Sequence, residues 1–330
     1  MNAKITEESI LELARGFMAS RVLLSGAELD LFTLLAKDPL TAEEIAVAAK
    51  AELRGIVILL DALSAIGLLL KKDGSYHIEP SVAPLLSTSA PDSILPMVLH
   101  MGAVWRNWSQ LTDAVLGKNT PNLETKGALA KDNLKAFIGA MHVVASKAAP
   151  EVVAAINPGR ARRLLDVGGG SGTYTLAMLS AMPEMKATLF DLPRVIEMAH
   201  DRIQSADMLD RVKLVAGDFY KDELPPGHDL AFLSAIIHQN SSEQNELLYG
   251  RICRALNSGG RIVIRDHVMS PDRTQPLEGA LFSINMLVGT EGGRTYTFDE
   301  IKEGLTAAGF TRINLIRTKG MFSLVEGFKP

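Results

Sequence analysis

The chain has 330 residues, of which 47% are hydrophobic and 22% charged, with a formal net charge of −4. This length predicts two domains, or one large domain with an appendage. The negative charge argues against nucleic acid or an anionic membrane as a partner, and no run of 18 apolar residues predicts a membrane span. The single cysteine, Cys253, excludes an internal disulfide, which fits a reducing compartment. Because no signal peptide is evident either, we expect a cytoplasmic protein.

Residues 1–90 are predicted to form a small domain of helices that ends in a β-hairpin. Apolar periodicity indicates helices near 5–20, 27–35 and 52–68. Thr41 and Glu44 form a capping box, which predicts a further helix to about Ala49. The dipeptide Asp73-Gly74 separates two short strands, as in a primed hairpin turn. Helices followed by such a hairpin predict a winged helix-turn-helix.

A winged helix can bind DNA, but the charge of this one favours another partner. Residues 1–100 contain 8 Lys and Arg against 13 Asp and Glu, a net charge of −5. The candidate recognition helix, Leu53–Ile66, contains one arginine and is apolar on nearly every face. Affinity for DNA depends mainly on neutralising phosphates, and a helix that is apolar all round is usually buried. We therefore interpret this domain as a dimerisation domain.

Residues 91–155 are predicted to form a helical connector that contains both tryptophans, Trp105 and Trp108. Packing between domains accounts for most of its large side chains. The alternative is that some of them line a pocket for an apolar or aromatic substrate.

The segment 164–173, Leu-Leu-Asp-Val-Gly-Gly-Gly-Ser-Gly-Thr, carries the strongest functional signal. It predicts a strand, a glycine turn and the start of a helix. Glycine allows positive φ and close approach of the backbone to a ligand, and a helix N-terminus offers free N–H groups. The segment therefore predicts a cofactor site, with a purely structural turn as the alternative.

Spacing and charge favour S-adenosylmethionine (SAM) over a dinucleotide at this turn. The dinucleotide fingerprint is G-x-G-x-x-G, whereas Gly168, Gly170 and Gly172 are spaced G-x-G-x-G. Asp166 would repel a pyrophosphate, but it would attract the ammonium and sulfonium groups of SAM.

Strands and helices alternate along residues 156–330, which predicts a parallel sheet with right-handed crossovers. The predicted strands are 163–167, 187–190, 212–216, 230–234 and 261–266. The final segments, 311–317 and 321–328, predict a β-hairpin, so that the last strand is antiparallel to its partner.

Taken together, these features resemble the SAM-dependent O-methyltransferases of the caffeate and acetylserotonin type, which include bacterial polyketide and carotenoid enzymes. The resemblance spans nearly the whole chain and is carried by residues 165–172, 190–193, 217–220, His238 and 292–295. It implies an α/β fold, with an N-terminal winged-helix dimerisation domain and a Rossmann-like catalytic domain that has a seven-stranded sheet. It also implies a homodimer.

The resemblance implies a set of cofactor-binding residues. Asp191 ends the second strand, where its carboxylate would accept both ribose hydroxyls, although such an acid is often only a helix cap. Asp218 would meet the adenine amino group, and Phe219 would pack on the ring unless it belongs to the core. The full set is Asp166, Gly168, Gly170, Asp191, Leu192, Asp218, Phe219 and Ser234.

The resemblance places the general base at His238, just beyond strand 230–234. A phenol with a pKa of about 10 is ionised to about one part in a thousand at pH 7, whereas a mostly neutral histidine can accept its proton. Asp266 is predicted to orient this imidazole, with a surface acid as the equal alternative. Thr295 stands where plant relatives carry a second acid. His267 would point to the opposite face if its strand continued, and no metal is predicted.

The acceptor is predicted to be a hydroxylated aromatic or polyketide-like small molecule. Its pocket is expected to include Met101, Met141, His142, Asn285 and Met286. A SAM-binding enzyme of the same fold with non-methylating chemistry is one alternative, and a winged-helix regulator that senses SAM is another.

Overall fold

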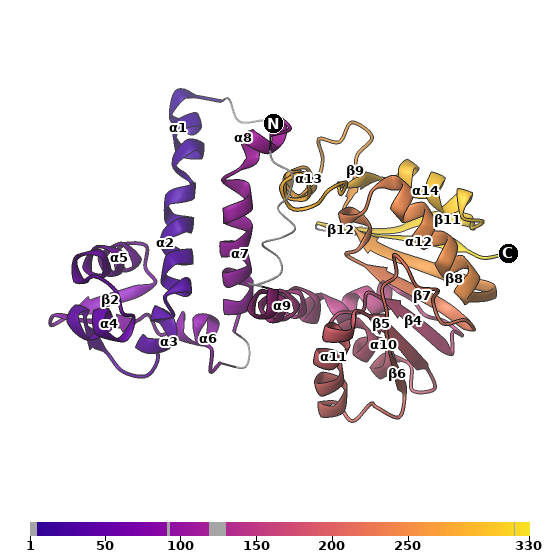
Figure 1. The fold of residues 1–330 in the computed structure, drawn as a ribbon, viewed down its shortest axis with the longest axis horizontal. Helices are drawn as coiled ribbons and strands as arrows, with labels where there is room; N and C mark the ends of the chain where they lie inside the picture. Colours follow the sequence, from indigo (N-terminus) through magenta and orange to yellow (C-terminus); the bar gives the residue numbers. More distant parts are fainter. Residues whose placement is uncertain (1–4, 91–92, 119–129, 320) are drawn as a thin grey trace. The chain divides into compact units, whose positions relative to one another are not determined.

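The computed structural model describes residues 5–90, 93–118, 130–319 and 321–330 (Figure 1). The chain forms two compact units, the first from residues 1–105 and 135–143 and the second from residues 106–134 and 144–330. The predicted connector, 91–155, is therefore divided between the two units. Its helices α7 (Leu95–Trp108) and α9 (Ala130–Ile156) each contribute residues to both.

The first unit combines helices with a small sheet in the order β1-β3-β2, and both strand pairs are antiparallel. The predicted capping box of Thr41 and Glu44 and the predicted hairpin are confirmed. Asp73 and Gly74 connect the hairpin with φ values of 49° and 79°, as a primed turn requires. In chain order the elements are α1 (Glu7–Arg15), α2 (Phe17–Glu28), α3 (Leu31–Leu35), β1 (Leu40–Thr41), α4 (Ala42–Ala48), α5 (Leu53–Ala65), β2 (Leu69–Lys72), β3 (Ser75–Ile78) and α6 (Ala83–Leu86).

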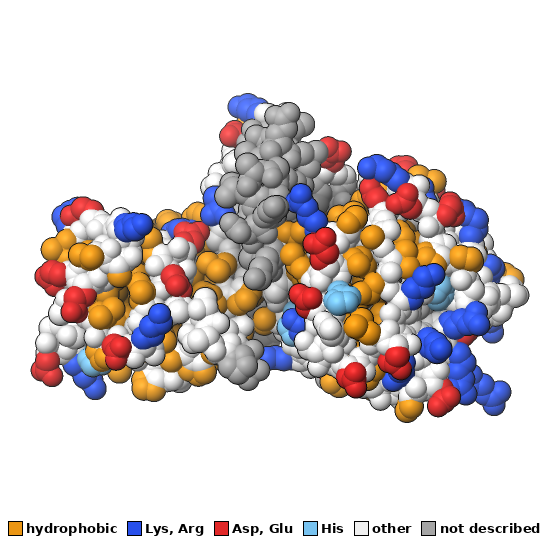
Figure 2. Space-filling model, turned by 60° about the horizontal axis from the view of Figure 1, so that its bottom comes forward, with side chains coloured by type: hydrophobic (Ala, Val, Ile, Leu, Met, Phe, Trp, Pro, Cys, Tyr) orange, Lys and Arg blue, Asp and Glu red, His pale blue; other side chains and the backbone are white. Residues whose placement is uncertain are grey.

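Several large apolar side chains of the first unit are exposed. Helix α1 buries none of its residues. Helix α5 buries Ile56, Leu60 and Leu63 but exposes Leu53 and Ile58. Figure 2 shows apolar side chains interspersed with acids and bases over this unit, at the left. Within one chain, then, α5 is buried along one face only.

The second unit is built on a seven-stranded sheet in the order β11-β12-β8-β7-β4-β5-β6. Strand β12 is antiparallel to both β8 and β11, and the other pairs are parallel, which confirms the predicted topology. The strands are β4 (Arg163–Val167), β5 (Lys186–Asp191), β6 (Val212–Ala216), β7 (His228–Ser234), β8 (Leu256–Asp266), β11 (Thr311–Lys319) and β12 (Phe322–Phe328), and a separate parallel pair comprises β9 (Val268–Met269) and β10 (Tyr296–Thr297).

Helices cover both faces of this sheet. The apolar core on one face includes residues of α9, α10 and α11, and the core on the other includes residues of α12 and α14. Because β4, β5, β7 and β8 are parallel, the turns that follow them meet at one edge, where ligands of open α/β sheets bind. The helices are α8 (Leu111–Val115), α10 (Thr173–Ala181), α11 (Pro193–Ser205), the 3-10 helix η2 (Ile237–Gln239), α12 (Ser242–Ala255), α13 (Leu277–Gly289) and α14 (Phe298–Ala307).

In the part of the chain that the structure describes, no single helix combines the length and apolar character of a membrane span. One bent pair, 137–143 with 145–156, meets those criteria only when its two helices are taken together.

Arg211 satisfies carbonyl groups at the end of α10. Its guanidinium donates hydrogen bonds to the backbone oxygens of Leu179, Met182 and Met185, at 2.7–3.1 Å. The substitution Arg211→Met keeps the aliphatic stem but removes these charged donors. We expect it to lower the free energy of unfolding by about 2–3 kcal/mol in chemical denaturation.

Lys213→Met is the matched control, because Lys213 is exposed and lies in the strand that follows Arg211. It should change the stability by less than about 0.5 kcal/mol. Equal stability of the two variants would contradict the capping role of Arg211.

Candidate active site

The glycine turn after β4 has the backbone conformation that its residues predict. The φ values of Gly168, Gly170 and Gly172 are 66°, 56° and 76°, and residues with a side chain rarely adopt such positive values. A Cβ at Gly168 would lie 2.6 Å from the side chain of Ile236, whereas a Cβ at Gly170 would meet nothing within 4 Å. The turn is therefore packed at its start and open at Gly170, where a ligand can approach the backbone.

Asp191, at the end of β5, is joined directly to this turn. Its Oδ2 accepts a hydrogen bond from the Gly170 N–H at 2.8 Å, and its Oδ1 accepts one from the Leu192 N–H at 2.7 Å. Burial raises the pKa of Asp191, and the two N–H bonds oppose that shift. Each carboxylate oxygen can accept a further hydrogen bond, so the site fits the two hydroxyls of a ribose.

Asp166 lies beneath the turn and is 2% exposed. Its Oδ2 accepts a hydrogen bond from the Thr175 hydroxyl at 2.6 Å. Burial raises the pKa of Asp166 to about 6, and the nearby charge of Asp191 adds to the rise. A cation beside Asp166 would stabilise its charged form, which suits the ammonium group of SAM.

The predicted adenine-binding residues lie just beyond β6. Phe219 is partly buried, and its Cε1 would be 3.6 Å from a Cβ at Gly168, so the ring lies beside the turn. Asp218 is already engaged, because its Oδ1 accepts the Tyr220 N–H and its Oδ2 pairs with Lys221 at 3.2 Å. Lys221 is largely exposed, so this ion pair is weak.

His238 and Asp266, predicted as a pair, are in direct contact. The Nδ1 of His238, in η2, lies 2.7 Å from the Oδ1 of Asp266, at the end of β8. Asp266 is 0% exposed and His238 is 9% exposed. Burial alone would raise the pKa of Asp266, but the charge and hydrogen bond of His238 hold it below the usual value. A proton on Nδ1 that faces this carboxylate leaves Nε2 as an acceptor.

Two aromatic neighbours of His238 were not predicted from the sequence. Strand β8 ends at Asp266, so the condition under which His267 would face away is not met. The ring of His267 lies 6.0 Å from that of His238 and stacks on Phe282 at 4.1 Å, and Phe282 in turn lies 4.8 Å from His238. For His267, the sequence offered one signal of a role in the site, namely a polar residue directly after a buried strand. For Phe282, the sequence offered no such signal.

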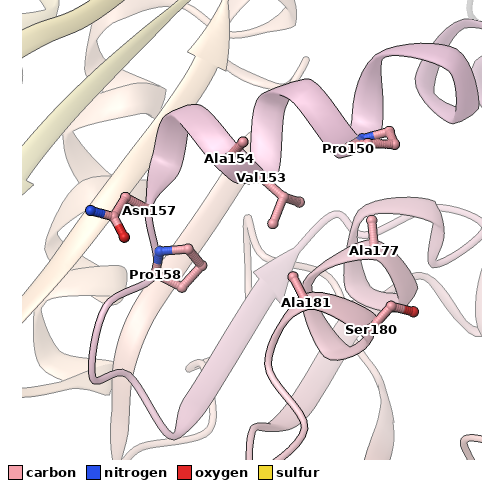
Figure 3. A pocket seen from close by; sticks show the side chains of 8 residues that line it. All are labelled: Pro150, Val153, Ala154, Asn157, Pro158, Ala177, Ser180 and Ala181. Atoms are coloured by element: carbon pink, nitrogen blue, oxygen red, sulfur yellow. The ribbon is translucent and has the colours of Figure 1, made fainter.

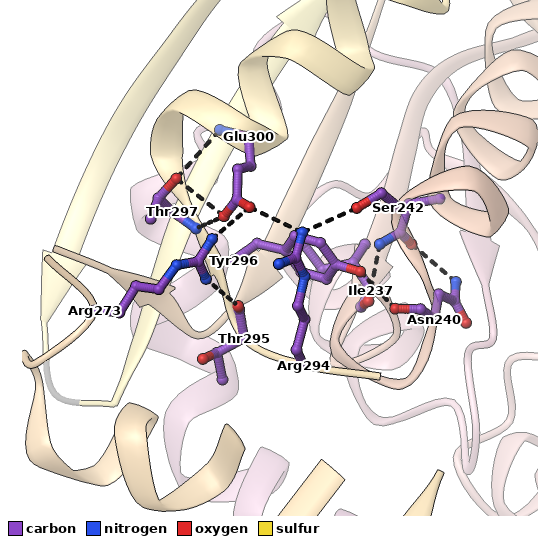
Figure 4. Close-up of polar contacts among 10 residues, drawn as sticks. Ile237, Asn240, Ser242, Arg273, Arg294, Thr295, Tyr296, Thr297 and Glu300 are labelled. Carbon is purple, nitrogen blue, oxygen red and sulfur yellow. Dashed lines mark hydrogen bonds and ion pairs between the residues drawn. The ribbon is translucent and has the colours of Figure 1, made fainter. Parts of the chain in front are cut away.

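A polar network holds the backbone around His238 (Figure 4). Asn245 donates to the Ile237 oxygen at 2.9 Å, and the Tyr296 hydroxyl donates to the Asn240 oxygen. Arg294 bridges Ser242 and Glu300. These contacts link η2 to the start of α12 and to the segment before α14.

The Gly-Gly-Arg-Thr segment, 292–295, packs against this backbone. A Cβ at Gly293 would lie 2.6 Å from the carbonyl oxygen of His238, so glycine is required for this approach. Thr295, which the resemblance placed where plant relatives carry a second acid, is buried, and its carbonyl oxygen accepts a hydrogen bond from Arg273. Among the described residues, Asp266 is the one carboxylate hydrogen-bonded to His238.

The residues predicted for the acceptor pocket are divided between the units. Asn285 and Met286 lie in α13 of the second unit, where the Oδ1 of Asn285 accepts a hydrogen bond from the Trp108 indole at 3.0 Å and Met286 is buried. Met101, Met141 and His142 belong to the first unit. Met101 is exposed there, and the other two are half-buried.

A hollow of about 590 Å³ lies elsewhere in the second unit, between the end of α9 and α10 (Figure 3). None of the predicted site residues lines it. Within the described ranges, no group of three or more His, Cys, Asp or Glu side chains is arranged to bind a metal ion.

Known proteins match this chain over nearly its full length. A 3-hydroxy-5-methyl-1-naphthoate 3-O-methyltransferase from Streptomyces sahachiroi is 32% identical, over 97% of this chain and 94% of its own. The tetracenomycin polyketide synthesis 8-O-methyl transferase of Streptomyces glaucescens is also 32% identical, over 97% and 96%. The solved structure of human N-acetylserotonin methyltransferase in complex with SAM has a TM-score of 0.83 and 28% identity, and covers 100% of this chain and 99% of its own.

Two family models also match, the O-methyltransferase dimerisation domain over residues 11–86 and the O-methyltransferase domain over residues 108–311. These matches confirm the predicted fold class, the class of enzyme and the use of SAM that is general in the family. The chain belongs to the O-methyltransferase family and carries the dimerisation domain of that family at its N-terminal end.

Proposed function

We propose that this enzyme methylates a hydroxyl group of a small aromatic or polyketide-like acceptor, with His238 as the general base. The observation that carries this proposal is the buried contact of 2.7 Å between the Nδ1 of His238 and Asp266. It supports a ring that is held through Nδ1, so that Nε2 is the nitrogen left to take a proton, at the sheet edge that also holds the glycine turn.

The residues of the chain account for the proton transfer. Nε2 of His238 takes the proton of the acceptor hydroxyl, and the oxygen keeps the electron pair that makes it a nucleophile. Asp266 stabilises the resulting imidazolium and holds the ring in place. Bound SAM supplies an electrophilic methyl group.

The cofactor is proposed to lie along the carboxyl edge of β4, β5 and β6. Asp191 would accept the ribose hydroxyls, and Leu192 and Phe219 would contact the nucleoside. The open backbone at Gly170 and the hydrogen bond between Gly170 and Asp191 support this arrangement. Asp166 would face the ammonium group. Gly168, Asp218 and Ser234 complete the proposed set.

The acceptor is inferred from chemistry and from relatives. The matched enzymes are named for a hydroxynaphthoate, a tetracenomycin polyketide and N-acetylserotonin, all of which contain aromatic rings. Phe282 contributes an aromatic face beside His238 that suits a flat acceptor. Asn285 and Met286 of α13, with Met101, Met141 and His142, remain the proposed acceptor residues.

We also infer a homodimer formed through the first unit. The match to the dimerisation domain and the exposed apolar residues of α1 and α5 support it.

Loss of the imidazole tests the base. His238→Ala should lower kcat by roughly 100-fold or more, because general-base assistance is removed, and Asp266→Asn should lower kcat less because the ring remains. Both variants should bind S-adenosylhomocysteine (SAH) within a few-fold of the wild type. Formation of SAH with a panel of hydroxynaphthoates and hydroxyindoles provides the rates, and calorimetry provides the affinities. Unchanged turnover of His238→Ala would exclude the residue from the mechanism.

Removal of the carboxylate at the end of β5 tests the cofactor site. Asp191→Ala should weaken SAH binding at least about 10-fold, because the hydrogen bonds to the ribose and the support of Gly170 are lost. Asp201→Ala is the control, since Asp201 is exposed on the neighbouring helix α11. Equal SAH affinity of the two variants in calorimetry would refute the assignment to the ribose.

His267 is not proposed as a second base, because burial lowers its pKa to about 4 despite the charge of Asp266. As the pH falls, this histidine takes up a proton near pH 6.5 in the unfolded chain but only near pH 4 in the folded chain. Stability that is present above pH 6.5 is therefore lost as the pH falls towards 4.

His267→Phe should reduce this acid-induced loss by about 3 kcal/mol, because it removes the titrating group and keeps a ring to stack on Phe282. Denaturation at a series of pH values between 4 and 7 measures the difference. Parallel stability curves for the variant and the wild type would show that His267 titrates normally.

A further inference from the structure

Arg265, the residue before Asp266 in β8, is a buried cation without an anion. Its residue exposure is 5%, and among the described residues it forms no ion pair with a carboxylate. Its Nη1 lies 3.4 Å from the Ser234 hydroxyl, a long and weak hydrogen bond, and its Nε is buried with no partner. Because side chains alternate along a strand, Arg265 points to the sheet face opposite Asp266.

The contacts that Arg265 does make are not enough to offset burial of its charge. The guanidinium lies 3.7 Å from the ring centre of Phe322 and 5.3 Å from that of Tyr174, and both rings attract a cation only modestly. The charge of Asp266 acts on Arg265 from the opposite face of the sheet without an ion pair, and Arg317, whose own partner is Glu151, adds a second positive charge nearby. A buried guanidinium in this setting is expected to have a counter-ion.

The surroundings of Arg265 place that missing anion beside the glycine turn. Tyr174 is in the first turn of α10, directly after Gly172 and Thr173, and its hydroxyl is also buried without a partner. Ser234 pairs with Arg265 across β7 and β8 and ends the strand that leads to His238. The Arg265 guanidinium and the Tyr174 hydroxyl thus lie together at the edge proposed to bind the cofactor.

We propose that Arg265 binds the α-carboxylate of SAM, with Tyr174 as a second donor. The inference rests on the proposed cofactor site. The amino-acid end of SAM carries an ammonium and a carboxylate on one carbon atom, and the chain offers a buried acid, Asp166, and a buried base, Arg265, on the same sheet edge. Arg265 would then distinguish SAM and SAH from nucleosides that lack the carboxylate.

Two ligands that differ only in the carboxylate test the proposal. SAH and its decarboxylated amine, S-(5′-adenosyl)-3-thiopropylamine, share the nucleoside, the sulfur and the ammonium group. In calorimetry, wild-type protein should bind SAH roughly 10- to 100-fold more tightly than the amine. Arg265→Met should lose most of this preference by weakening SAH alone, and Arg265→Lys should keep part of it.

Arg261→Met is the matched control, because Arg261 lies earlier in the same strand, β8, is half-buried and is paired with Glu326. Its preference for SAH should equal that of the wild type. A measurement without ligand adds an independent readout. Removing an uncompensated buried charge should leave the Tm of ligand-free Arg265→Met equal to or above that of the wild type, while the rise in Tm on adding SAH becomes smaller.

The proposal is overturned if Arg265→Met keeps the wild-type preference for SAH, or if it weakens both ligands equally. It is also overturned if the ligand-free variant is strongly destabilised, because Arg265 would then serve the fold. Failure of the wild type to bind either ligand would be a different result, since it would refute the cofactor site itself.

Discussion

Asp266 is fully buried, and a carboxylate in that position stays charged only if the protein compensates it. His238 provides the compensation through a contact of 2.7 Å, and the His267 N–H adds a second hydrogen bond at 2.8 Å. The same contact sets the orientation of the imidazole. One contact therefore both keeps Asp266 charged and positions His238, the proposed base. An apolar residue at position 266 would remove both effects.

The rest of the site repeats this solution with different partners. Asp191 is held by two backbone N–H groups, and Asp166 by the Thr175 hydroxyl. Both carboxyl groups have a raised pKa because burial outweighs these bonds. At the sheet edge, among the described residues, Asp166 on β4 thus lacks a positive partner, and Arg265 on β8, with β7 between the two strands, lacks a negative one. A ligand that carries both charges close together complements the two deficits without any change of fold.

Much of this arrangement was predictable because the signals are local. The glycine turn, the strand ends at Asp191 and Asp266 and the capping box at Thr41 depend on residues close in sequence, and parallel strands bring their carboxyl ends together whatever lies between them. Family resemblance selected His238 from seven histidines. By contrast, Phe282 reaches His238 from a helix 44 positions further along the chain, and no periodicity indicates that contact.

The sequence by itself determined the parallel sheet with its antiparallel last strand and the glycine turn after β4, and with the family resemblance it led to His238 and Asp266 as the proposed base and acid. Only the tertiary structure decided which way the side chains beyond β8 point, that His267 lies beside His238, and that Arg265 is buried without an anion. The physical reason is that backbone patterns follow from periodicity and glycine placement, whereas side-chain partners depend on where strands end and on which distant elements pack over them.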